Sequence, residues 1–478
     1  MLAGKLLKDC PGEFCDIDIT GIVDDSRKVS EGNAFVCIKG YETDGHLFAA
    51  KAAENGAALI VAEDKVDVSV PVVYVEDTRK AIACMAAEFY GHPADKLSLI
   101  GITGTNGKTT ITYLVKSILE AAGKCVGVIG TNQNIIGDKL LLTKSTTPTT
   151  PNALELQQLF NEMVYHGAEY VVMEVSSHAL ELDRVYGCEF SVGVFTNLTQ
   201  DHLDFHGTME NYYKAKAKLF AVSERGVVNY DDEYGKRIAN ERKDILTVGF
   251  SDDCELKAEN IKISSRGAEF DMIYNGIRYG ANIRIPGKFS VYNALCAAGA
   301  ALVLGIDMKS IIEGLGNAPG VVGRIEVVPT DTDYTVIIDY AHTPDGLENV
   351  INCVKGFAEG RTITLFGCGG DRDNTKRPVM GEIAGRLSDF SIITSDNPRT
   401  EDPEKIVREI EAGMKRTDGE YVLITDRREA IGYSLGIAKK GDVIILAGKG
   451  QETYQIIGKE KFDFDERIEV YKYLKSKK

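Results

Sequence analysis

The feature that most limits the fold of this chain is the segment GITGTNGKT, from Gly101 to Thr109. It fits the pattern GxxxxGK[ST] and stands between the apolar run KLSLIGI and the helix-like run ITYLVKSILEAAG. In a strand–loop–helix unit of this kind, glycines let backbone N–H groups and the helix N-terminus surround phosphates. Lys108 would neutralise the outer phosphates, and the Thr109 hydroxyl would face Mg²⁺. The segment therefore predicts a site for a nucleoside triphosphate.

The same loop says less about how the nucleotide is used. No NKxD guanine-reading motif follows it, which favours ATP over GTP. A motor, a transporter subunit, a kinase and a ligase are all compatible with the loop by itself. The residues expected to contact the nucleotide here are Gly104, Thr105, Asn106, Gly107, Lys108, Thr109 and Thr110.

Length and charge exclude several classes of protein. With 478 residues, and at ~150 residues per domain, about three domains are expected. The net charge of −16 argues against a nucleic-acid partner, because a phosphate backbone needs basic surface. The most apolar helix-like stretch, 294–306, is too short to cross a bilayer and predicts a buried helix. No signal peptide is visible and the cysteines form no CxxC pair, so we expect a cytoplasmic enzyme with reduced thiols and no membrane insertion.

Short β-rich runs alternate with helical patterns over most of the chain, which predicts α/β domains with mainly parallel sheets. Pro93 and the polar residues after it indicate one boundary, and Pro319, Gly320 and Gly323 indicate another. We therefore expect three regions, at 1–95, 96–321 and 322–478.

The third region contains five strand-like runs: TVIIDYA, TITLFGC, FSIITSD, YVLITD and DVIILAG. Each is followed at once by polar residues or glycines. Because ligands of open α/β sheets bind beyond the carboxyl ends of the strands, DYAHTPDG, GCGGDRD, SDNPRTEDP and AGKGQE are candidate ligand loops. GCGG does not extend to GxGxxG, so no dinucleotide site is expected there.

Residues that follow strands of the central region could hold a metal beside the nucleotide. Glu174 ends the apolar run YVVME, where a carboxylate can ligate a cation or simply meet solvent. His202 and His206 could share one helix face as metal ligands, although such pairs are often only hydrogen-bonded loop residues. The motif YYKAKAKLF adds three lysines that by default would form a solvated helix face: Lys214, Lys216 and Lys218.

In combination, these motifs resemble the Mur ligases of peptidoglycan synthesis. The segments follow one another in that family's order over nearly the whole chain: GTNGKTT, EVSSHAL, TNLTQDHLDFHG, the AKAKLF lysines, YNALCAA, VVGR and DYAHTPDG. The resemblance implies an N-terminal α/β uridine-binding domain, a central P-loop ATPase domain with a mainly parallel sheet, and a C-terminal Rossmann-like amino-acid-binding domain. It also implies a monomer that uses ATP and Mg²⁺ to form an amide through an acyl phosphate.

The resemblance carries roles over to individual positions. As metal ligands it implies Thr109, Glu174, His202 and Lys216, the last as a carbamate formed with CO₂. For the nucleotide and the phosphoryl group it implies Asn293, Arg324, Asp339 and His342. For the uridine side it implies Ser26, Arg27 and His46, and for the sugar, diphosphate and peptide it implies Thr149, Thr150, Ser176 and Arg184. The residues implied in catalysis are Lys108, Glu174, His202, Lys216, Arg324 and Asp339.

The third region is implied to select the incoming amino acid. SDNPRTEDP contains DNPR, which in the family goes with meso-2,6-diaminopimelate, added to the D-glutamate γ-carboxylate of UDP-N-acetylmuramoyl-L-alanyl-D-glutamate. Diaminopimelate differs from lysine by one carboxylate, which the planar guanidinium of Arg399 can bind through two hydrogen bonds. The other implied contacts of the amino acid are Arg372, Asp396, Asn397, Pro398, Gly448 and Glu452.

Other activities fit parts of the pattern. A sibling ligase would add L-lysine, or a dipeptide to the next intermediate, and folylpolyglutamate synthase shares the ATPase chemistry but not the uridine motifs. A catalytically silent nucleotide-binding regulator on the same scaffold would have lost some of the catalytic side chains. All of those expected are present: Lys108, Glu174, His202, Lys216 and Asp339.

Overall fold

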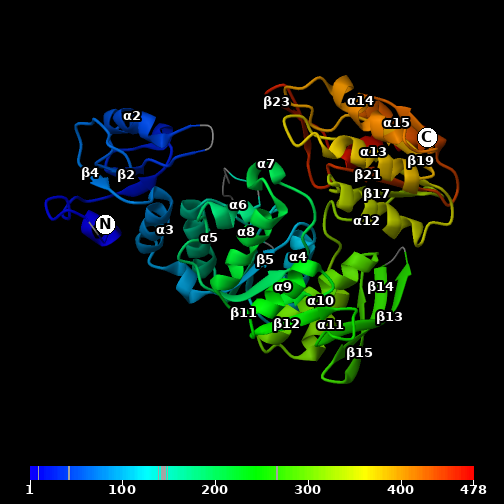
Figure 1. The fold of residues 1–478 in the computed structure, drawn as a ribbon, viewed down its shortest axis with the longest axis horizontal. Helices are drawn as coiled ribbons and strands as arrows, with labels where there is room; N and C mark the ends of the chain where they lie inside the picture. Colours follow the sequence, from blue (N-terminus) through cyan, green and yellow to red (C-terminus); the bar gives the residue numbers. More distant parts are fainter. Residues whose placement is uncertain are drawn as a thin grey trace. The chain divides into compact units, whose positions relative to one another are not determined.

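The computed structural model describes residues 1–8, 10–40, 43–137, 139–141, 147, 149–264 and 267–477. The chain forms two compact units, each assembled from several segments. Figure 1 labels the helices and strands by the names used below. Unit 1 consists of Met1–Thr103, Gly123–Val194 and Lys214–Gly226. Unit 2 consists of Gly104–Ala122, Phe195–Tyr213 and Val227–Lys478.

The N-terminal part of unit 1 is built on a parallel sheet in the order β1-β2-β3-β4. Every residue of β2 and β3 is buried, as expected for strands of a parallel sheet that is covered on both faces. Helix α3 begins after Asp77, whose carboxylate accepts the backbone N–H groups of Arg79 and Lys80. The bounds are β1 (Gly21–Val23), β2 (Asn33–Val36), β3 (Leu59–Ala62), β4 (Val72–Tyr74), η1 (Ser26–Lys28), η2 (Gly45–Phe48), α1 (Ala3–Leu6), α2 (Ala49–Glu54) and α3 (Thr78–Phe89).

The rest of unit 1 contains strands in the order β10-β5-β9-β6-β7-β8. Strands β5, β9 and β6 run parallel, so their carboxyl ends meet at one edge, whereas β7 and β8 add a short antiparallel extension. The bounds are η3 (Pro93–Lys96), β5 (Ser98–Thr103), β6 (Val126–Ile129), β7 (Ile135–Ile136), β8 (Lys139–Leu140), α5 (Ala153–Tyr165), β9 (Tyr170–Glu174), α6 (Ser177–Glu181) and β10 (Phe190–Phe195). Helix α8 (Met209–Ala221) and strand β11 (Ser223–Asn229) have residues in both units.

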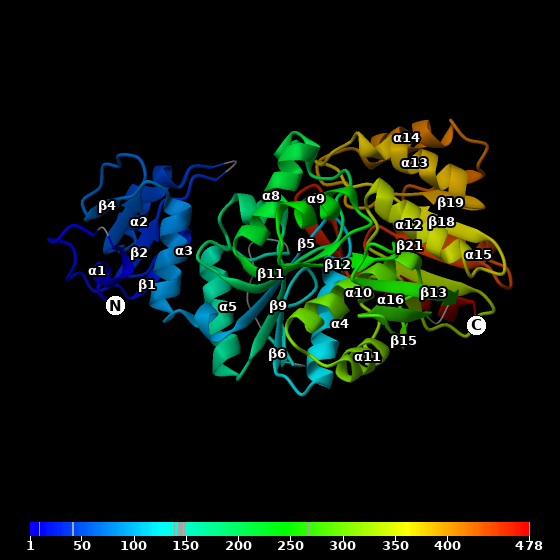
Figure 2. The same cartoon turned by 60° about the horizontal axis from the view of Figure 1, so that its bottom comes forward.

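Unit 2 begins with helix α4, which packs against α10 and α11 (Figure 2). Helix α10 contains the apolar stretch at 294–306 and is buried along most of its length, as the sequence predicts. Strands β12 to β15 lie in the order β15-β14-β13-β12. Strand β12 pairs with β13 in parallel, whereas β13, β14 and β15 pair antiparallel. The bounds are α4 (Lys108–Ala121), α7 (Leu203–His206), α9 (Glu233–Glu241), β12 (Ile245–Gly249), β13 (Leu256–Ser264), β14 (Gly267–Tyr274), β15 (Ile277–Ile283), α10 (Lys288–Val303) and α11 (Met308–Asn317).

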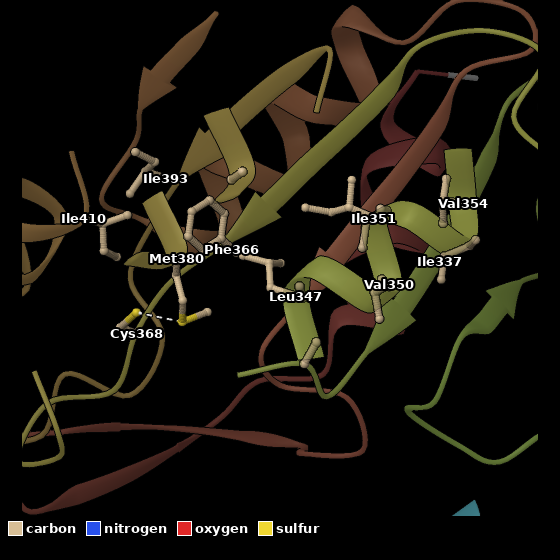
Figure 3. Close-up of a cluster of buried hydrophobic side chains, with 14 of the residues drawn as sticks. Ile337, Leu347, Val350, Ile351, Val354, Phe366, Cys368, Met380, Ile393 and Ile410 are labelled. Atoms are coloured by element: carbon tan, nitrogen blue, oxygen red, sulfur yellow. Dashed lines mark hydrogen bonds between the residues drawn. The ribbon is translucent and has the colours of Figure 1, made fainter. Parts of the chain in front are cut away.

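The C-terminal part of unit 2 has a six-stranded sheet in the order β16-β17-β21-β18-β19-β20, parallel except for the edge strand β16. Figure 3 shows part of its core, where Phe366 and Ile393 from strands meet Leu347, Met380 and Ile410 from helices. The bounds are β16 (Glu326–Val328), β17 (Thr335–Asp339), α12 (Pro344–Lys355), β18 (Thr362–Phe366), α13 (Lys376–Leu387), β19 (Phe390–Ile393), α14 (Pro403–Met414), β20 (Tyr421–Leu423), α15 (Arg427–Ile437), β21 (Val443–Ala447), β22 (Tyr454–Ile457), β23 (Glu460–Asp463) and α16 (Glu466–Ser476).

The α/β architecture expected from the sequence is confirmed. All five strands expected in the third region are present, as β17 to β21. The sheets are mixed rather than wholly parallel, because β13 to β15 form an antiparallel meander that the sequence analysis did not identify. All ten cysteines are free thiols, and no helix in the described part of the chain is long and apolar enough to span a membrane. The boundaries near 95 and 321 stay predictions.

Candidate active site

The phosphate loop joins β5 to α4, and two of its glycines have backbone conformations that other residues rarely adopt. Gly104 has φ +146°, and a Cβ added to it would overlap the Thr196 hydroxyl. Gly107 has φ +90°, and a Cβ there would overlap the Asn293 side-chain oxygen. Glycine is therefore required at both positions, because both conformation and space exclude a side chain.

Hydrogen bonds to the segment after β10 hold this loop in shape. The backbone N–H of Thr105 donates to the Asn197 carbonyl, and that of Asn106 donates to the Asn197 side-chain oxygen, both at 2.9 Å. The Asn106 carbonyl accepts from the Thr196 hydroxyl at 2.6 Å. Lys108 Nζ donates to the carbonyls of Gly104 and Thr105 at 2.9 Å, so its ammonium lies directly over the loop.

A second group of predicted residues in unit 2 comes from the segment before β17 and from the end of that strand. Arg324 stacks on the Tyr340 ring, with its guanidinium carbon 4.8 Å from the centroid, and its Nη2 lies 3.4 Å from Thr109 Oγ1. Arg324 Nε is buried and has no acceptor among the residues described. A buried guanidinium N–H without an acceptor fits a site that takes an anion.

Asp339 is the last residue of β17 and His342 follows it by three residues. Arg324 is close enough to affect the pKa of both. Asp339 is buried and accepts the backbone N–H groups of Ile325 at 2.8 Å and Ala341 at 2.7 Å. Burial raises the pKa of Asp339, and Arg324 acts in the opposite direction. His342 Nδ1 lies 2.9 Å from the Tyr340 carbonyl, which can only accept, so Nδ1 carries the proton. Burial lowers the pKa of His342 to about 4, which leaves this ring neutral near pH 7.

His202 lies in the segment between β10 and α7 in a left-handed conformation, with φ +52°. Its side chain is half-exposed, and its Nε2 lies 3.5 Å from the Asp201 carboxylate. Burial raises the pKa of Asp201, but His202, His342 and Lys376 outweigh burial and hold this pKa below its usual range. His206 is instead buried and stacked on Tyr212, with ring centroids 5.0 Å apart, so packing accounts for it without a metal.

In unit 1, Glu174 ends β9 as a buried carboxylate. It accepts the backbone N–H of Thr131 at 2.9 Å and the Thr131 hydroxyl at 3.0 Å. That hydroxyl also lies 3.0 Å from the hydroxyl of Thr149, which has φ +67°. A β-branched residue with positive φ is a conformational outlier, and such outliers cluster at functional sites. Glu174 and Thr149 therefore lie close together, with Thr131 between them.

The remaining predicted residues of this segment converge on Thr150. Its buried hydroxyl donates to the Glu174 carbonyl at 2.9 Å and accepts the backbone N–H of Ser176 at 3.0 Å. Arg184 Nη1 donates to the Thr150 carbonyl at 3.0 Å. Burial, with a smaller effect of the neighbouring Arg79, lowers the pKa of Arg184. Two guanidinium groups close enough to repel each other fit a place where an anion binds.

Burial distinguishes the three lysines of helix α8. Lys216 is only 1% exposed, whereas Lys214 is exposed and Lys218 pairs with Glu181 at the surface, with Nζ 2.8 Å from the carboxylate. Because a lysine is almost never fully buried unless its charge is paired, burial sets Lys216 apart from the other two. The sequence separates the three only by their register in the motif.

The N-terminal residues expected on the uridine side lie in two short 3-10 helices, Ser26 and Arg27 in η1 and His46 in η2. Ser26 is buried, while the exposed Arg27 pairs with Asp25 through two hydrogen bonds of 2.9 Å. His46 Nδ1 lies 2.6 Å from Asp44, and its Nε2 accepts the backbone N–H groups that follow β3, at 3.0 and 3.2 Å. Both ring nitrogens of His46 are therefore engaged within the protein, and its ring faces are what it can offer to a ligand.

The loops after β18, β19 and β21 hold the residues expected to bind the amino acid. Arg399 has φ +51° and donates from Nη1 to the Gly370 carbonyl at 2.7 Å. Asn397 Nδ2 donates to Glu452 at 2.9 Å. Asp396 Oδ2 is buried without a hydrogen-bond partner among the described atoms, and a Cβ added to Gly448 would lie 2.8 Å from it.

Two further residues are expected to bind the amino-acid substrate, Arg372 and Pro398. Arg372 is exposed and its Nη1 donates to the Asp371 carbonyl at 3.1 Å. Pro398 follows Asn397 in the turn, and its carbonyl approaches Gly370 so closely that a Cβ on Gly370 would overlap it. The three loops thus converge at the carboxyl edge of the sheet, as expected.

Sequence reasoning missed several residues that shape these sites. Thr131 follows β6, and its position after a buried strand was an available signal. Arg377 is fully buried and binds Glu401, Glu409 and the Gly369 carbonyl, so it holds the loop after β18 against the loop after β19. Nothing in the spacing of Arg377 distinguishes it from a surface residue of helix α13.

The donor sets fit a nucleotide and a magnesium ion. The glycine cradle and the buried Arg324 Nε suit phosphate oxygens, which need N–H donors and positive charge. Mg²⁺ prefers oxygen ligands, and each unit by itself offers one among the predicted residues: the Thr109 hydroxyl in unit 2 and the buried Glu174 carboxylate in unit 1.

The glycine cradle gives a direct test of the loop. We expect Gly104→Ala to weaken ATP binding by more than ~tenfold, because the new methyl group must displace the Thr196 side chain and the loop with it. Isothermal titration with ATP measures this. Gly123→Ala is the matched control, since Gly123 also has positive φ, at +76°, but a Cβ there meets nothing within 4 Å. Equal weakening in both variants would show that backbone strain alone, and not the cradle, controls binding.

Family models match three segments of the chain. They are the Mur ligase family catalytic domain at residues 18–90, the Mur ligase middle domain at 102–301, and the Mur ligase glutamate ligase domain at 323–450. Together they cover most of the sequence, in the order that the sequence motifs follow.

Curated relatives and solved structures agree with these matches. UDP-N-acetylmuramoyl-L-alanyl-D-glutamate–2,6-diaminopimelate ligase 1 of Clostridium acetobutylicum is 53% identical over 466 residues, covering 96% of this chain and 95% of that protein. The corresponding ligase of Clostridium botulinum is 50% identical over 466 residues, with the same coverage of 96% and 95%. A solved structure of a UDP-N-acetylmuramoyl-L-alanyl-D-glutamate–2,6-diaminopimelate ligase is 32% identical, has a TM-score of 0.71, and covers 100% of this chain and 99% of its own. The chain belongs to the Mur ligase family.

Proposed function

We propose that this protein is an ATP-dependent ligase that adds meso-2,6-diaminopimelate to the D-glutamate γ-carboxylate of UDP-N-acetylmuramoyl-L-alanyl-D-glutamate, in peptidoglycan synthesis. Relatives with about half of their residues identical over nearly the full length carry that activity in their names. The observation that carries the proposal is the DNPR turn, in which Arg399 is held by the Gly370 carbonyl beside Asn397 and Glu452. This turn supplies a cation for the carboxylate that distinguishes diaminopimelate from lysine.

The reaction explains why cations gather at the nucleotide loop. A carboxylate does not react with an amine near neutral pH, because its leaving group is poor. Transfer of the ATP γ-phosphoryl group to a carboxylate oxygen gives an acyl phosphate, and attack of the free amine then forms the amide and releases phosphate. Two anions, ATP and the carboxylate, must be brought together against their repulsion. Lys108 over the loop and Arg324 beside Thr109 supply the opposing charge.

The proposed magnesium ligands are Thr109, Glu174, His202 and Lys216, the last after carbamylation. When bound, Mg²⁺ would neutralise the phosphate oxygens and align the reacting groups. The buried position of Lys216 supports this role, because its amine, once deprotonated, can add CO₂ with loss of a second proton to give a carbamate anion, which Mg²⁺ would neutralise when bound. Thr131 holds the Glu174 carboxylate in place through two hydrogen bonds.

The remaining residues are assigned by position. We assign the UDP-muramoyl substrate to region 1–95 with Ser26, Arg27 and His46, and its phosphate and peptide portions to the Thr149, Thr150, Ser176 and Arg184 group. ATP belongs to region 96–321, with Asn293 beside Gly107, and to Arg324, Asp339 and His342 from the following segment. The amino acid belongs to region 322–478. We further propose that the protein acts as a monomer in the cytoplasm, where its nucleotide substrates are found.

The choice of amino acid is tested by phosphate release from ATP with the UDP-muramoyl dipeptide. We expect turnover with meso-diaminopimelate and little with L-lysine. In Arg399→Ala, kcat/KM for diaminopimelate should fall at least about thirtyfold, which corresponds to ~2 kcal/mol of lost binding free energy, because the distal carboxylate loses a charged partner. Arg416→Ala, which removes an exposed arginine of the same region, is the control. Equal use of both amino acids by the wild-type protein, or normal kinetics in Arg399→Ala, would contradict the assignment.

A second prediction concerns Lys216. We expect Lys216→Ala to be nearly inactive, at least ~100-fold below wild type, because no other residue supplies its carbamate. A short carboxylate such as formate or acetate should restore part of the activity by occupying the vacated space. Lys218→Ala, which removes the exposed lysine that pairs with Glu181, should stay close to wild type and serves as the control. Full activity of Lys216→Ala without added carboxylate would remove this residue from the mechanism.

A further inference from the structure

Lys449 is a buried cation directly behind the residues proposed to hold the amino acid. It follows strand β21, after Gly448, and its side chain is 0% exposed. Its Nζ lies 2.9 Å from Glu452 Oε2 and 3.2 Å from Asn397 Oδ1. The rings of Tyr454 and Phe464 lie around the ammonium, with centroids 5.7 and 5.9 Å away. An ammonium removed from water in this way is stable only while these partners stay in place.

The contacts of Lys449 fix the orientation of the Asn397 amide. Asn397 Oδ1 accepts from Lys449 Nζ and from the backbone N–H of Ile456, at 2.9 Å. Both of these groups can only donate, so the oxygen must face them and the NH₂ group must face the other way. In that orientation Nδ2 donates one hydrogen to Glu452 Oε2, and its second hydrogen remains for another acceptor.

The same ammonium holds the Glu452 carboxylate. Oε2 accepts from both Lys449 Nζ and Asn397 Nδ2, each at 2.9 Å. Asn397 and Glu452 lie on different loops, after β19 and β21, and Lys449 Nζ touches both. One ammonium thus holds a polar side chain from each of two loops that carry predicted amino-acid contacts.

We propose that Lys449 is a positioning residue that sets specificity for the distal centre of the diamino acid. This inference rests on the proposed function, since it assigns roles around the same amino acid. Lys449 turns the Asn397 NH₂ group toward the substrate, where it donates to a carboxylate oxygen. It also fixes the Glu452 carboxylate where it accepts from an ammonium group. The pair thereby recognises an α-amino-acid centre with both charges, and Lys449 touches neither charge itself.

The test measures the KM of each substrate separately in Lys449→Met, a change that keeps the side-chain length and removes the charge. We expect KM for meso-diaminopimelate to rise roughly tenfold to hundredfold, because Asn397 can rotate and Glu452 loses its partner. The KM values for ATP and for the UDP-muramoyl dipeptide should stay within about twofold of wild type. Lys449→Gln, which keeps a donor for Asn397 without the charge, should lie between wild type and Lys449→Met.

Arg361→Met is the matched control. Arg361 forms an ion pair of 2.7 Å with the buried Asp442. Asp442 comes immediately before strand β21, whereas Lys449 follows this strand, so the ion pair lies at the opposite end of the strand. Its loss should lower the urea midpoint of unfolding while the three KM values stay unchanged. If Lys449→Met does not fold, the comparison of Lys449→Gln with wild type and Arg361→Met carries the test.

A double-mutant cycle shows whether Lys449 acts through its partner. In the Glu452→Gln background, the further change Lys449→Gln should raise KM for diaminopimelate less than it does in wild type. Equal effects in both backgrounds, an unchanged KM for diaminopimelate, or a parallel rise of all three KM values would overturn the positioning role. Failure of the proposed function looks different, because then the wild-type protein itself would release no phosphate with diaminopimelate.

Discussion

Parallel pairing of buried strands places their carboxyl ends along one edge of a sheet, and every proposed site in this protein depends on that constraint. The phosphate loop follows β5, Thr131 follows β6, and Glu174 ends β9. In the C-terminal sheet, Asp339 ends β17 and the three amino-acid loops follow β18, β19 and β21. Residues far apart in the sequence therefore share an edge because their strands are parallel and adjacent.

Cations lie at these predicted sites, although the molecule as a whole is negatively charged. The chain carries a net charge of −16, yet the residues that would meet phosphate and carboxylate groups are cations held at particular points. Arg324 is fixed by stacking on Tyr340, and Arg184 by the Thr150 carbonyl. A few local cations suffice for a small anionic ligand even in a chain whose overall charge is negative.

Much of the fold follows from local sequence signals, because an apolar run bounded by polar residues and glycines is a strong indicator of a buried strand. The antiparallel strands β13 to β15 were not predicted from the sequence because they have no continuous apolar run. Each has one partly exposed face, as in the alternating burial of Leu256–Ser264. The motif predicts that Gly104 and Gly107 shape a phosphate loop, and the structure adds a physical reason for glycine there in the contacts with Thr196 and Asn293.

The candidate site was harder to predict where function depends on which way a side chain faces. Only the register of the family motif separates Lys216 from Lys214 and Lys218 in the sequence, whereas burial separates them in the structure. Lys449 and the orientation of Asn397 leave no trace in the sequence, since they arise from contacts between loops that follow different strands. Residue propensity and hydrophobic periodicity predict local structure from residues that are neighbours in the sequence. They do not predict contacts between loops that are distant in the sequence.

The central claim is that ATP activates the substrate carboxylate itself, and isotope transfer tests it most directly. UDP-N-acetylmuramoyl-L-alanyl-D-glutamate labelled with ¹⁸O in both oxygens of the γ-carboxylate is turned over with ATP and meso-diaminopimelate, and the released phosphate is analysed by mass. Passage through an acyl phosphate predicts one ¹⁸O atom in each phosphate released and one retained in the new amide. Phosphate without ¹⁸O, formed at the same rate as product, would show that water cleaves ATP and would contradict the account.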